Sequence, residues 1–314
     1  MPATEIKVDI AGRVLTLTNL DKVLYPATGF TKAEVIDYYL NIAATILPHL
    51  ADRAITRLRF PDGTGPNAFS FYEKNAPNGC PGWVRLQRVA ASDSDIDYVV
   101  ADSPATLVLL ANYAALELHT PQWRIPAPAP GLIRLDAPDA PASDLLVIDL
   151  DPGAGTTMAT SAKAALLAAA RLAADGLIAY PRTSGSKGLQ LQAAIEPVCG
   201  RRATAYARRV ALDLVAAQPD LFIVQNSVAA RAEKVFVDVL QNQSARNTIA
   251  NYSLRGRDRP TVATPITWDE VAEAAQGRPL AFVAGDVLAR VEEMGDLAAD
   301  LLADSGAPLP LTDE

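Results

Sequence analysis

The alternation of apolar and polar residues predicts short strands mixed with amphipathic helices in the first half of the chain. The expected strands are Ile6–Ile10, Val14–Thr18, Ala54–Phe60, Ala68–Phe71, Trp83–Val89 and Ile96–Val100. The first two should form a hairpin that turns at Ala11-Gly12. Thr31 and Glu34 have the spacing of a capping box, and the apolar residues that follow predict a helix from Lys32 to Leu47.

Two segments in the middle of the chain show less regular patterns. Thr106–Leu118 is apolar throughout, so it is expected to be either a helix or a long strand that leads to Glu117 and His119. Closely spaced prolines follow, and they predict an irregular connector at residues 126–143.

The second half alternates apolar strands with helices, a pattern typical of the α/β class. The expected elements are strands at Leu145–Gly153, Leu177–Arg182, Leu189–Ala193 and Val235–Leu240 and helices at Thr160–Ala174 and Arg201–Ala217. In the last strand, the alternation would place Phe236, Asp238 and Leu240 on one face. We therefore expect one α/β (α+β) domain over residues 1–304, with β-sheets flanked by helices. It would comprise an N-terminal α/β lobe at 1–125, the connector, a catalytic lobe at 144–304 and a tail at 305–314.

Composition bounds the class of protein. Half of the 314 residues are apolar, which is enough to bury a large core. No apolar run reaches membrane-spanning length, and the N-terminus lacks the basic-then-apolar pattern of a signal peptide, so a cytoplasmic location is expected. Cys80, Cys199, His49 and His119 cannot form the usual four-ligand zinc site without carboxylates, and lone buried thiols are expected.

Charge is distributed unevenly along the chain. The net charge of −8 argues against a nucleic-acid partner, because phosphates need clustered Lys and Arg. Yet residues 182–259 carry 12 Lys and Arg against 6 Asp and Glu, whereas residues 260–314 carry 2 against 11. This predicts a basic segment inside an acidic envelope, unless the acids of the tail are only solvated helix faces.

The apolar run Leu145–Gly153 ends in two aspartates, Asp149 and Asp151, which would share one face of a strand. Two carboxylates that close repel each other, so either one keeps a proton or a hard cation such as Mg²⁺ or Mn²⁺ binds between them. A helix cap or an Asp-Pro turn would give the same pattern. Asp238 is a candidate third ligand, although a lone acid in a strand is usually inert.

Three further features could bind phosphates or bases. Lys22 and Lys32, the second in the first turn of a helix, could hold a phosphate or could be ordinary surface lysines. Residues 183–188, TSGSKG, could form an anion nest with Lys187 or a plain hairpin turn. Basic and aromatic residues also interleave, as they do on nucleic-acid surfaces and in strand cores: Arg57, Arg59, Lys74, Phe60, Phe71 and Tyr72.

The order of these motifs resembles the polymerase domain of bacterial DNA ligase D, which belongs to the archaeo-eukaryotic primase superfamily. The matching segments are TNLDKVLYP, RFPDG, EKNAPNG, DLDPG (149–153), SGSKG (184–188), VDVLQN (237–242), ARNTIANYSLR (245–255) and TPITWDEV (264–271). The resemblance covers nearly the whole chain, to about Leu302. Neither a KxDG ligase motif nor a nuclease segment occurs, so the chain is similar to stand-alone primase-polymerase members that fill gaps in repair.

The resemblance also implies roles for individual residues. Asp149, Asp151 and Asp238 would be the metal-binding catalytic acids. Residues near the incoming nucleotide would be Arg59, His119, Ser184, Lys187, Gln190, Arg231, Gln241 and Arg255. Asn19, Lys22 and Lys32 would grip a downstream 5′-phosphate, and Phe60 and Phe71 would stack near the template. Gln190 departs from the family, which has a triphosphate-contacting His there, so it bears on nucleotide affinity rather than on the metal site.

What the resemblance implies is a template-dependent nucleotidyltransferase that extends primers and fills short gaps, as in non-homologous end joining. Catalysis would use a two-metal site with Mn²⁺ or Mg²⁺. The implied partners are gapped or broken DNA with a 5′-phosphate, NTPs or dNTPs with ribonucleotides preferred, and a separate ATP-dependent DNA ligase. A nucleoid-associated monomer without a membrane partner is expected.

Two other functions stay open from the residues alone. An aspartate-nucleophile phosphatase also carries two aspartates after an apolar strand, but Gly153 stands where that class normally has Thr or Val. A non-catalytic DNA-binding module is the second, and the three retained carboxylates argue against it.

Overall fold

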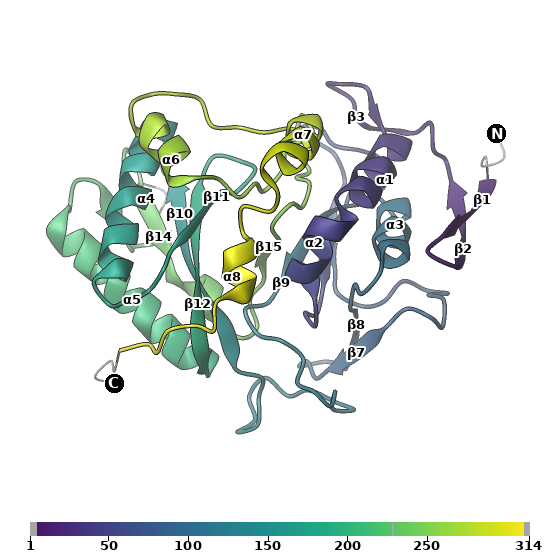
Figure 1. The fold of residues 1–314 in the computed structure, drawn as a ribbon, viewed down its shortest axis with the longest axis horizontal. Helices are drawn as coiled ribbons and strands as arrows, with labels where there is room; N and C mark the ends of the chain where they lie inside the picture. The colour runs from purple at the N-terminus through teal and green to yellow at the C-terminus, as the bar shows by residue number, and fades with distance from the viewer. Residues whose placement is uncertain (1–4, 228, 311–314) are drawn as a thin grey trace.

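Two β-sheets, each packed with helices, form the body of the structure, a computed structural model that describes residues 5–227 and 229–310 (Figure 1). The first sheet has the strand order β11 (Tyr180–Thr183), β12 (Leu189–Val198), β10 (Ser143–Pro152), β14 (Val235–Asp238) and β13 (Phe222–Ile223). The second has the order β15 (Thr248–Ile249), β9 (Ala115–Thr120), β5 (Thr56–Arg59) and β6 (Phe71–Glu73). The α/β (α+β) class with helix-flanked sheets is confirmed.

The helices gather on opposite sides of the molecule. Beside the first sheet lie α4 (Met158–Ala173), α5 (Gly200–Ala217) and α6 (Trp268–Ala275), and beside the second lie α1 (Lys32–Asn41), α2 (Ala43–Leu50) and α3 (Pro104–Asn112) (Figure 1). Two further helices follow along the chain, α7 (Ala284–Met294) and α8 (Ala299–Ala303). Three two-stranded sheets complete the fold: β1 (Glu5–Ile10) with β2 (Arg13–Thr18), β3 (Val23–Tyr25) with β4 (Phe30–Thr31), and β7 (Leu86–Val89) with β8 (Ile96–Val99).

Elements with strong local signals form where they were predicted. The first hairpin turns at Ala11 and Gly12, with φ of 50° and 77°. The capping box of Thr31 and Glu34 opens α1. In the first sheet, β10 pairs antiparallel with both β12 and β14, and β12 lies between β10 and β11, so the expected βαβ alternation is split by an inserted strand.

The predicted helix from Lys32 to Leu47 is interrupted. Ile42 ends α1, and α2 starts at Ala43 and continues to Leu50. Ile42 is fully buried in the core with residues of both helices. Neither the capping box nor the apolar periodicity predicts this break.

The apolar segment Thr106–Leu118 is a helix followed by a strand, so the prediction of a single element was wrong. Ser103 caps α3 through a hydrogen bond from the Thr106 amide (3.4 Å), and Ala114, at φ 55°, turns the chain into β9. Both elements are buried on nearly all sides. Because both elements are buried on all sides, they lack the regularly spaced polar positions that would distinguish a helix from a strand in the sequence.

Several predicted strand boundaries are shifted: β7 and β11 begin three residues later than predicted and β12 continues to Val198, and β6 and β14 show the physical reason most clearly. The strand expected at Ala68–Phe71 lies at β6 instead, where Glu73 accepts hydrogen bonds from Arg57 (2.8 Å) and Arg59 (2.9 Å) of β5 and so fixes the register. The strand expected at Val235–Leu240 ends at Asp238, because Asp238 Oδ1 accepts from the Leu240 amide (3.0 Å) and caps a 3₁₀ turn.

The last part of the chain returns to the second sheet. β15 pairs with β9, and Tyr252, Leu254 and Val262 are buried in the core that α1 and α3 form. The expected division at residues 125 and 144 stays a prediction, since this core draws on both sides of it. Within the described ranges, none of the helices has the length and apolar character needed to cross a membrane. Both cysteines are free thiols, but Cys80 is half-buried and Cys199 is exposed, so the prediction that they are buried was wrong.

Tyr39 tests how the returning segment is held. Its buried hydroxyl donates to the Leu116 carbonyl (2.7 Å) and accepts from the Leu254 amide (3.2 Å). Tyr39→Phe leaves both backbone groups unsatisfied, so we expect a loss of about 1–3 kcal/mol in the free energy of unfolding, measured in urea. The control Tyr72→Phe removes a hydroxyl from a side chain that is 63% exposed and should change it by less than about 0.5 kcal/mol. Equal losses in both variants would contradict this account.

Candidate active site

A row of four polar residues crosses the first sheet at paired register positions. Asp149 on β10 lies opposite Gln190 on β12 on one side and Asp238 on β14 on the other. Gln190 is paired in turn with Arg182 on β11. Directly paired side chains share a face of the sheet, so the row lies on one face. Asp151, two residues beyond Asp149, shares that face.

Hydrogen bonds link the members of this row. Arg182 Nη2 donates to Gln190 Oε1 (2.5 Å), and Gln190 Nε2 donates to Asp149 Oδ1 (2.9 Å). At the other end, Gln241 Nε2 donates to Asp238 Oδ2 (2.9 Å). The predicted acids are therefore brought together.

Burial and mutual repulsion perturb the carboxylates. Burial, followed by the charge of Asp151, raises the pKa of Asp149 to about 7, while the hydrogen bond from Gln190 opposes the rise. Burial and the charge of Asp238 also raise the pKa of Asp151, against the opposing charge of Arg231. The ionised form of both carboxylates is therefore disfavoured, because burial and repulsion outweigh the attraction of the surrounding cations.

Gly153 brings Arg231 close to the aspartates. A Cβ on Gly153 would lie 1.7 Å from the Arg231 carbonyl oxygen, so only glycine permits this approach. The Gly153 amide donates to the Lys234 carbonyl (2.9 Å), and the Glu233 amide donates to the Ala154 carbonyl (2.7 Å). The Arg231 guanidinium then lies over the Phe236 ring, 3.5 Å from its centroid, beside the position paired with Asp151.

The loop 184–188 is a tight turn closed on itself. The Ser184 amide donates to the Gly188 carbonyl (2.9 Å), and Ser184 Oγ accepts from the amides of Ser186 (3.3 Å) and Gly188 (3.2 Å). Two amides that an anion nest would offer are thus engaged within the loop. Lys187 remains a candidate for contact with an anion, since it lines the cleft described below.

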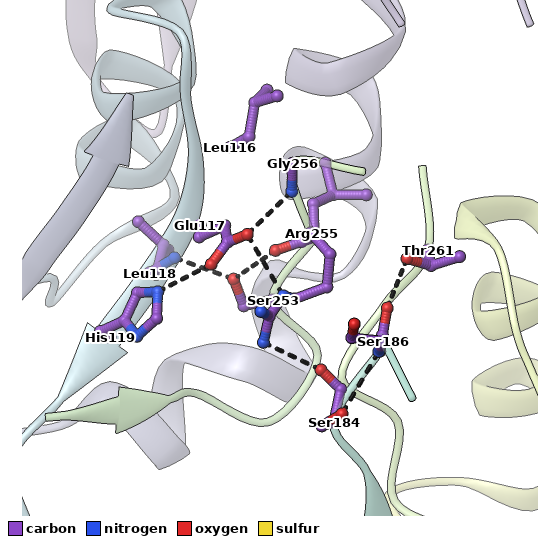
Figure 2. Close-up of polar contacts among 12 residues, drawn as sticks. Leu116, Glu117, Leu118, His119, Ser184, Ser186, Ser253, Arg255, Gly256 and Thr261 are labelled. Atoms are coloured by element: carbon purple, nitrogen blue, oxygen red, sulfur yellow. Dashed lines mark hydrogen bonds and ion pairs between the residues drawn. The ribbon is translucent and has the colours of Figure 1, made fainter. Parts of the chain in front are cut away.

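Glu117 organises the cations from the second sheet (Figure 2). Its Oε2 lies 2.9 Å from His119 Nε2, and its Oε1 accepts from the Gly256 amide (2.9 Å) and lies 3.2 Å from Arg255 Nε. Arg255 Nη1 in turn donates to the Ser184 carbonyl (3.0 Å). Burial alone would raise the pKa of Glu117, but the bond from His119 and the charge of Arg255 hold it below its usual value. Sequence analysis gave Glu117 no role, although it stands two residues from His119.

A cleft of about 640 Å³ joins these groups. Residues predicted from the sequence on its walls are His119, Asp149, Asp151, Ser184, Lys187, Gln190, Arg231, Gln241 and Arg255. Arg246, Asn247 and Arg257 also line it, although none was assigned a role from the sequence; the first two lie in the matching segment 245–255 and Arg257 lies in the basic segment.

Arg59 does not line this cleft, and its place beside the nucleotide stays a prediction. It lines a smaller cavity of about 170 Å³ with Asn19, Lys22 and Lys32. Its side chain is held there by the Tyr113 carbonyl (2.8 Å from Nε) and by the ion pair with Glu73 described above. The three residues predicted to grip a 5′-phosphate are therefore brought together, with Arg59 as a fourth member.

Lys32 is the buried cation of this smaller cavity, at 5% exposed. Its Nζ donates to the Thr18 carbonyl (2.6 Å), while Lys22 pairs with the exposed Asp62 (2.9 Å). Burial, with the charges of Lys22 and Arg59, lowers the pKa of Lys32 to about 8. Concentrated positive charge at the first turn of α1 is suited to an anion.

The two aromatic residues predicted to stack near the template, Phe60 and Phe71, differ in burial. Phe60 is only 6% exposed and lies against Gly256, where a Cβ would be 2.0 Å from its ring, so it cannot stack on a template base and that prediction is corrected. Phe71 is half-buried beside Phe69 (5.4 Å between centroids) and stays a candidate. Phe69 and Tyr72, each 63% exposed, are the accessible aromatics on or next to β6, and Tyr72 lines the cleft.

The three aspartates have the chemistry of a hard-cation site. Within residues 5–227 and 229–310, no three His, Cys, Asp or Glu side chains already converge as a formed metal site. Asp149, Asp151 and Asp238 nevertheless supply oxygen ligands from adjacent strands, and burial and repulsion raise the pKa values of the first two, an effect that a bound cation would oppose. These residues fit Mg²⁺ or Mn²⁺ better than a softer metal.

Comparisons with known proteins find one family and several relatives. The family described as "LigD, primase-polymerase domain" matches residues 31–298. The multifunctional non-homologous end joining protein LigD of Mycolicibacterium smegmatis is 45% identical over 290 residues, which are 92% of this chain and 36% of that protein. The bifunctional LigD of Bacillus subtilis is 30% identical over 283 residues, 90% of this chain and 43% of that protein. The chain thus spans well under half the length of these curated relatives.

One solved structure is similar over its full length. The polymerase domain of Mycobacterium tuberculosis ligase D, determined in complex with DNA, has a TM-score of 0.84 and 42% identity to this chain. The match covers 92% of this chain and 98% of that one.

The raised pKa of Asp149 predicts that the free energy of unfolding of the metal-free protein depends on pH. Between about pH 4 and pH 7 the folded state holds a proton that the unfolded state has lost, so stability falls as pH rises through this window. Asp149→Asn removes the buried charge that lowers stability at high pH. Above pH 7 the variant should therefore be more stable than the wild-type chain by on the order of 2 kcal/mol. The measurement is thermal unfolding in chelator at pH 4.5 and pH 8. A gain of equal size at both pH values, or no gain at pH 8, would contradict the assignment.

Proposed function

This chain belongs to the LigD primase-polymerase domain family, nucleotidyltransferases of the primase-polymerase type, and from that premise we propose that it extends primers across short gaps at DNA breaks. The substrates would be a nucleoside triphosphate, with ribonucleotides preferred, and a primed template whose downstream strand carries a 5′-phosphate. A separate ATP-dependent ligase would seal the product. The observation that carries the proposal is that Asp149 and Asp151, with Asp238 paired beside Asp149, line a cleft whose walls also carry cations.

The acids would hold the divalent ions of nucleotidyl transfer. Bound by Asp149, Asp151 and Asp238, such ions supply activation of the primer 3′-oxygen and stabilisation of the departing pyrophosphate. Asp149 is fixed by Gln190 and Asp238 by Gln241, so two of the acids are oriented before substrate arrives.

The cations would bind the triphosphate and neutralise its charge. Arg255 is held by Glu117 and by the Ser184 carbonyl, so it is positioned without a bound anion. Lys187 and Arg231 line the same cleft from two loops of the first sheet. Side chains held in this way lose little entropy when a phosphate binds.

A basic groove supports a path for the nucleic acid beyond the cleft. A groove of about 960 Å³ shares Lys74 and Ala245 with the cleft, and Arg134, Arg201 and Arg208 line its continuation. Sequence-independent binding of a strand needs such a row of cations together with an aromatic face, which the exposed Tyr72 supplies. The two alternative functions lose their support, because family membership and the arrangement of acids favour nucleotidyl transfer over phosphate hydrolysis or passive binding.

Primer extension tests the proposal directly. The full chain is incubated with Mn²⁺ or Mg²⁺, rNTPs or dNTPs, and nicked, gapped or 5′-phosphorylated gapped duplexes. We expect template-directed addition on gapped duplex, with rNTPs used better than dNTPs. Release of inorganic phosphate from nucleotides without extension would support a phosphatase instead.

Replacement of the acids separates chemistry from binding. Asp149→Ala or Asp151→Ala should reduce extension at least about 1000-fold, because each removes a ligand of the ions that stabilise the transition state. Affinity for DNA should stay within about twofold, since the strand is bound by cations elsewhere. The matched control, Glu196→Ala, removes an exposed acid from β12 of the same sheet and should leave extension unchanged. Residual extension above a few per cent in either aspartate variant would count against the site.

The small cavity predicts a preference for a 5′-phosphate that depends on pH. Wild-type chain at pH 7 should bind 5′-phosphorylated gapped DNA more tightly than the 5′-hydroxyl form by about 1–3 kcal/mol, the scale of charged hydrogen bonds. The preference should decline above about pH 8, where the free Lys32 amine loses its charge. Fluorescence anisotropy at low salt measures both affinities.

Two variants complete this test. The double variant Lys22→Ala with Lys32→Ala should bind both DNA forms equally, whereas Lys7→Ala, which removes an exposed cation from β1, should keep the preference. Equal affinity of the wild-type chain for the two DNA forms would show that Lys22 and Lys32 are structural or surface lysines.

A further inference from the structure

A buried chain of hydrogen bonds runs outward from Arg182 in two directions. One arm is the row already described, from Arg182 through Gln190 to Asp149. In the other arm, Arg182 Nη1 donates to Asn251 Oδ1 (2.8 Å), and Asn251 Nδ2 lies 3.3 Å from His49 Nδ1. The network therefore crosses from the first sheet to the returning segment and to α2.

The direction of every bond near Arg182 is fixed by chemistry. Arginine only donates and an ionised aspartate only accepts, so Gln190 must present its oxygen to Arg182 and its nitrogen to Asp149. By the same logic Asn251 accepts from Arg182 and donates to His49, whose Nε2–H then faces Asp296 Oδ2 at 2.9 Å. The guanidinium is thus held between two amides, and each arm ends at a carboxylate.

Gln190 separates two opposite charges that are both buried. Arg182 is 1% exposed and Asp149 is 6% exposed, yet an amide lies between them. A direct ion pair would engage the carboxylate oxygens and neutralise the charge that attracts a cation. The Gln190 amide is itself held by Arg182, and it donates a hydrogen bond to only one oxygen of Asp149, Oδ1. Because this donor is neutral, it does not neutralise the carboxylate.

We propose that Gln190, anchored by Arg182, is a positioning residue that orients Asp149 for a divalent cation. The inference rests on the function proposed above, and it assigns Gln190 a different part from the triphosphate contact that the family His at this position implies. Groups that orient metal ligands typically contribute 10- to 100-fold to metal affinity. The same range is expected for Gln190.

The test uses Mn²⁺ alone, without nucleotide or DNA, titrated into the metal-free full chain by calorimetry. Gln190→Met keeps the length of the side chain and removes both hydrogen bonds, and it should weaken Mn²⁺ binding about 10- to 100-fold. The matched control is Gln192→Met, two residues along β12 at the same 5% exposure but facing a different cavity, and it should change Mn²⁺ affinity by less than about twofold.

A second variant guards against a change that is only structural. Gln190→His at pH 8.5 has a neutral imidazole that can accept from Arg182 on one nitrogen and donate to Asp149 from the other, so it should recover most of the Mn²⁺ affinity lost in Gln190→Met. Melting temperatures in chelator confirm that each variant is folded before titration.

The outcomes separate the two roles of Gln190. Weaker Mn²⁺ binding in Gln190→Met with recovery in Gln190→His supports positioning. Unchanged Mn²⁺ affinity overturns the inference, and if the KM for nucleotide rises at the same time, Gln190 contacts the triphosphate instead. Wild-type chain that binds no Mn²⁺ overturns it as well, and primer extension by that same wild-type chain shows whether the proposed function fails with it.

Discussion

The antiparallel register of β10 with its two neighbours is the constraint on which the site depends. It sets Asp149 opposite both Gln190 and Asp238, and a slip of one residue would move these side chains to the opposite face. Asn242 holds the register through its side-chain amide. Its Nδ2 donates to the Val147 carbonyl (2.8 Å), and its Oδ1 accepts from the Val147 backbone amide (2.9 Å). The local fold and the chemistry of the site therefore share one set of backbone pairings.

The second sheet supplies what the first lacks. Grouped carboxylates destabilise a folded chain, and the first sheet places a single buried arginine beside them, through Gln190. Arg255 arrives from the returning segment and is held by Glu117, which keeps its negative charge despite burial. The cleft therefore lies where the two sheets meet. A bound cation would relieve the repulsion that remains among the aspartates.

Local signals in the sequence predicted much of this arrangement, and tertiary contacts account for what they missed. The capping box at Thr31 and the paired spacing of Asp149 and Asp151 need only neighbours in sequence, so they were predicted correctly. The burial of Phe60 under Gly256 depends on residues about 200 positions apart, which no local pattern contains. The same holds for Arg182, whose importance arises from cross-strand pairing and is not visible in its own surroundings in the sequence.

Asp149, Asp151 and Asp238 are proposed to hold divalent cations. Anomalous scattering at the manganese edge, from crystals soaked in Mn²⁺, tests this most directly. The account predicts anomalous peaks bound by the carboxylate oxygens of Asp149 and Asp151, with Asp238 as a further ligand. These peaks should be absent from crystals of Asp149→Asn grown and soaked in the same way. Peaks found only elsewhere on the molecule, or of equal height in both crystals, would contradict it.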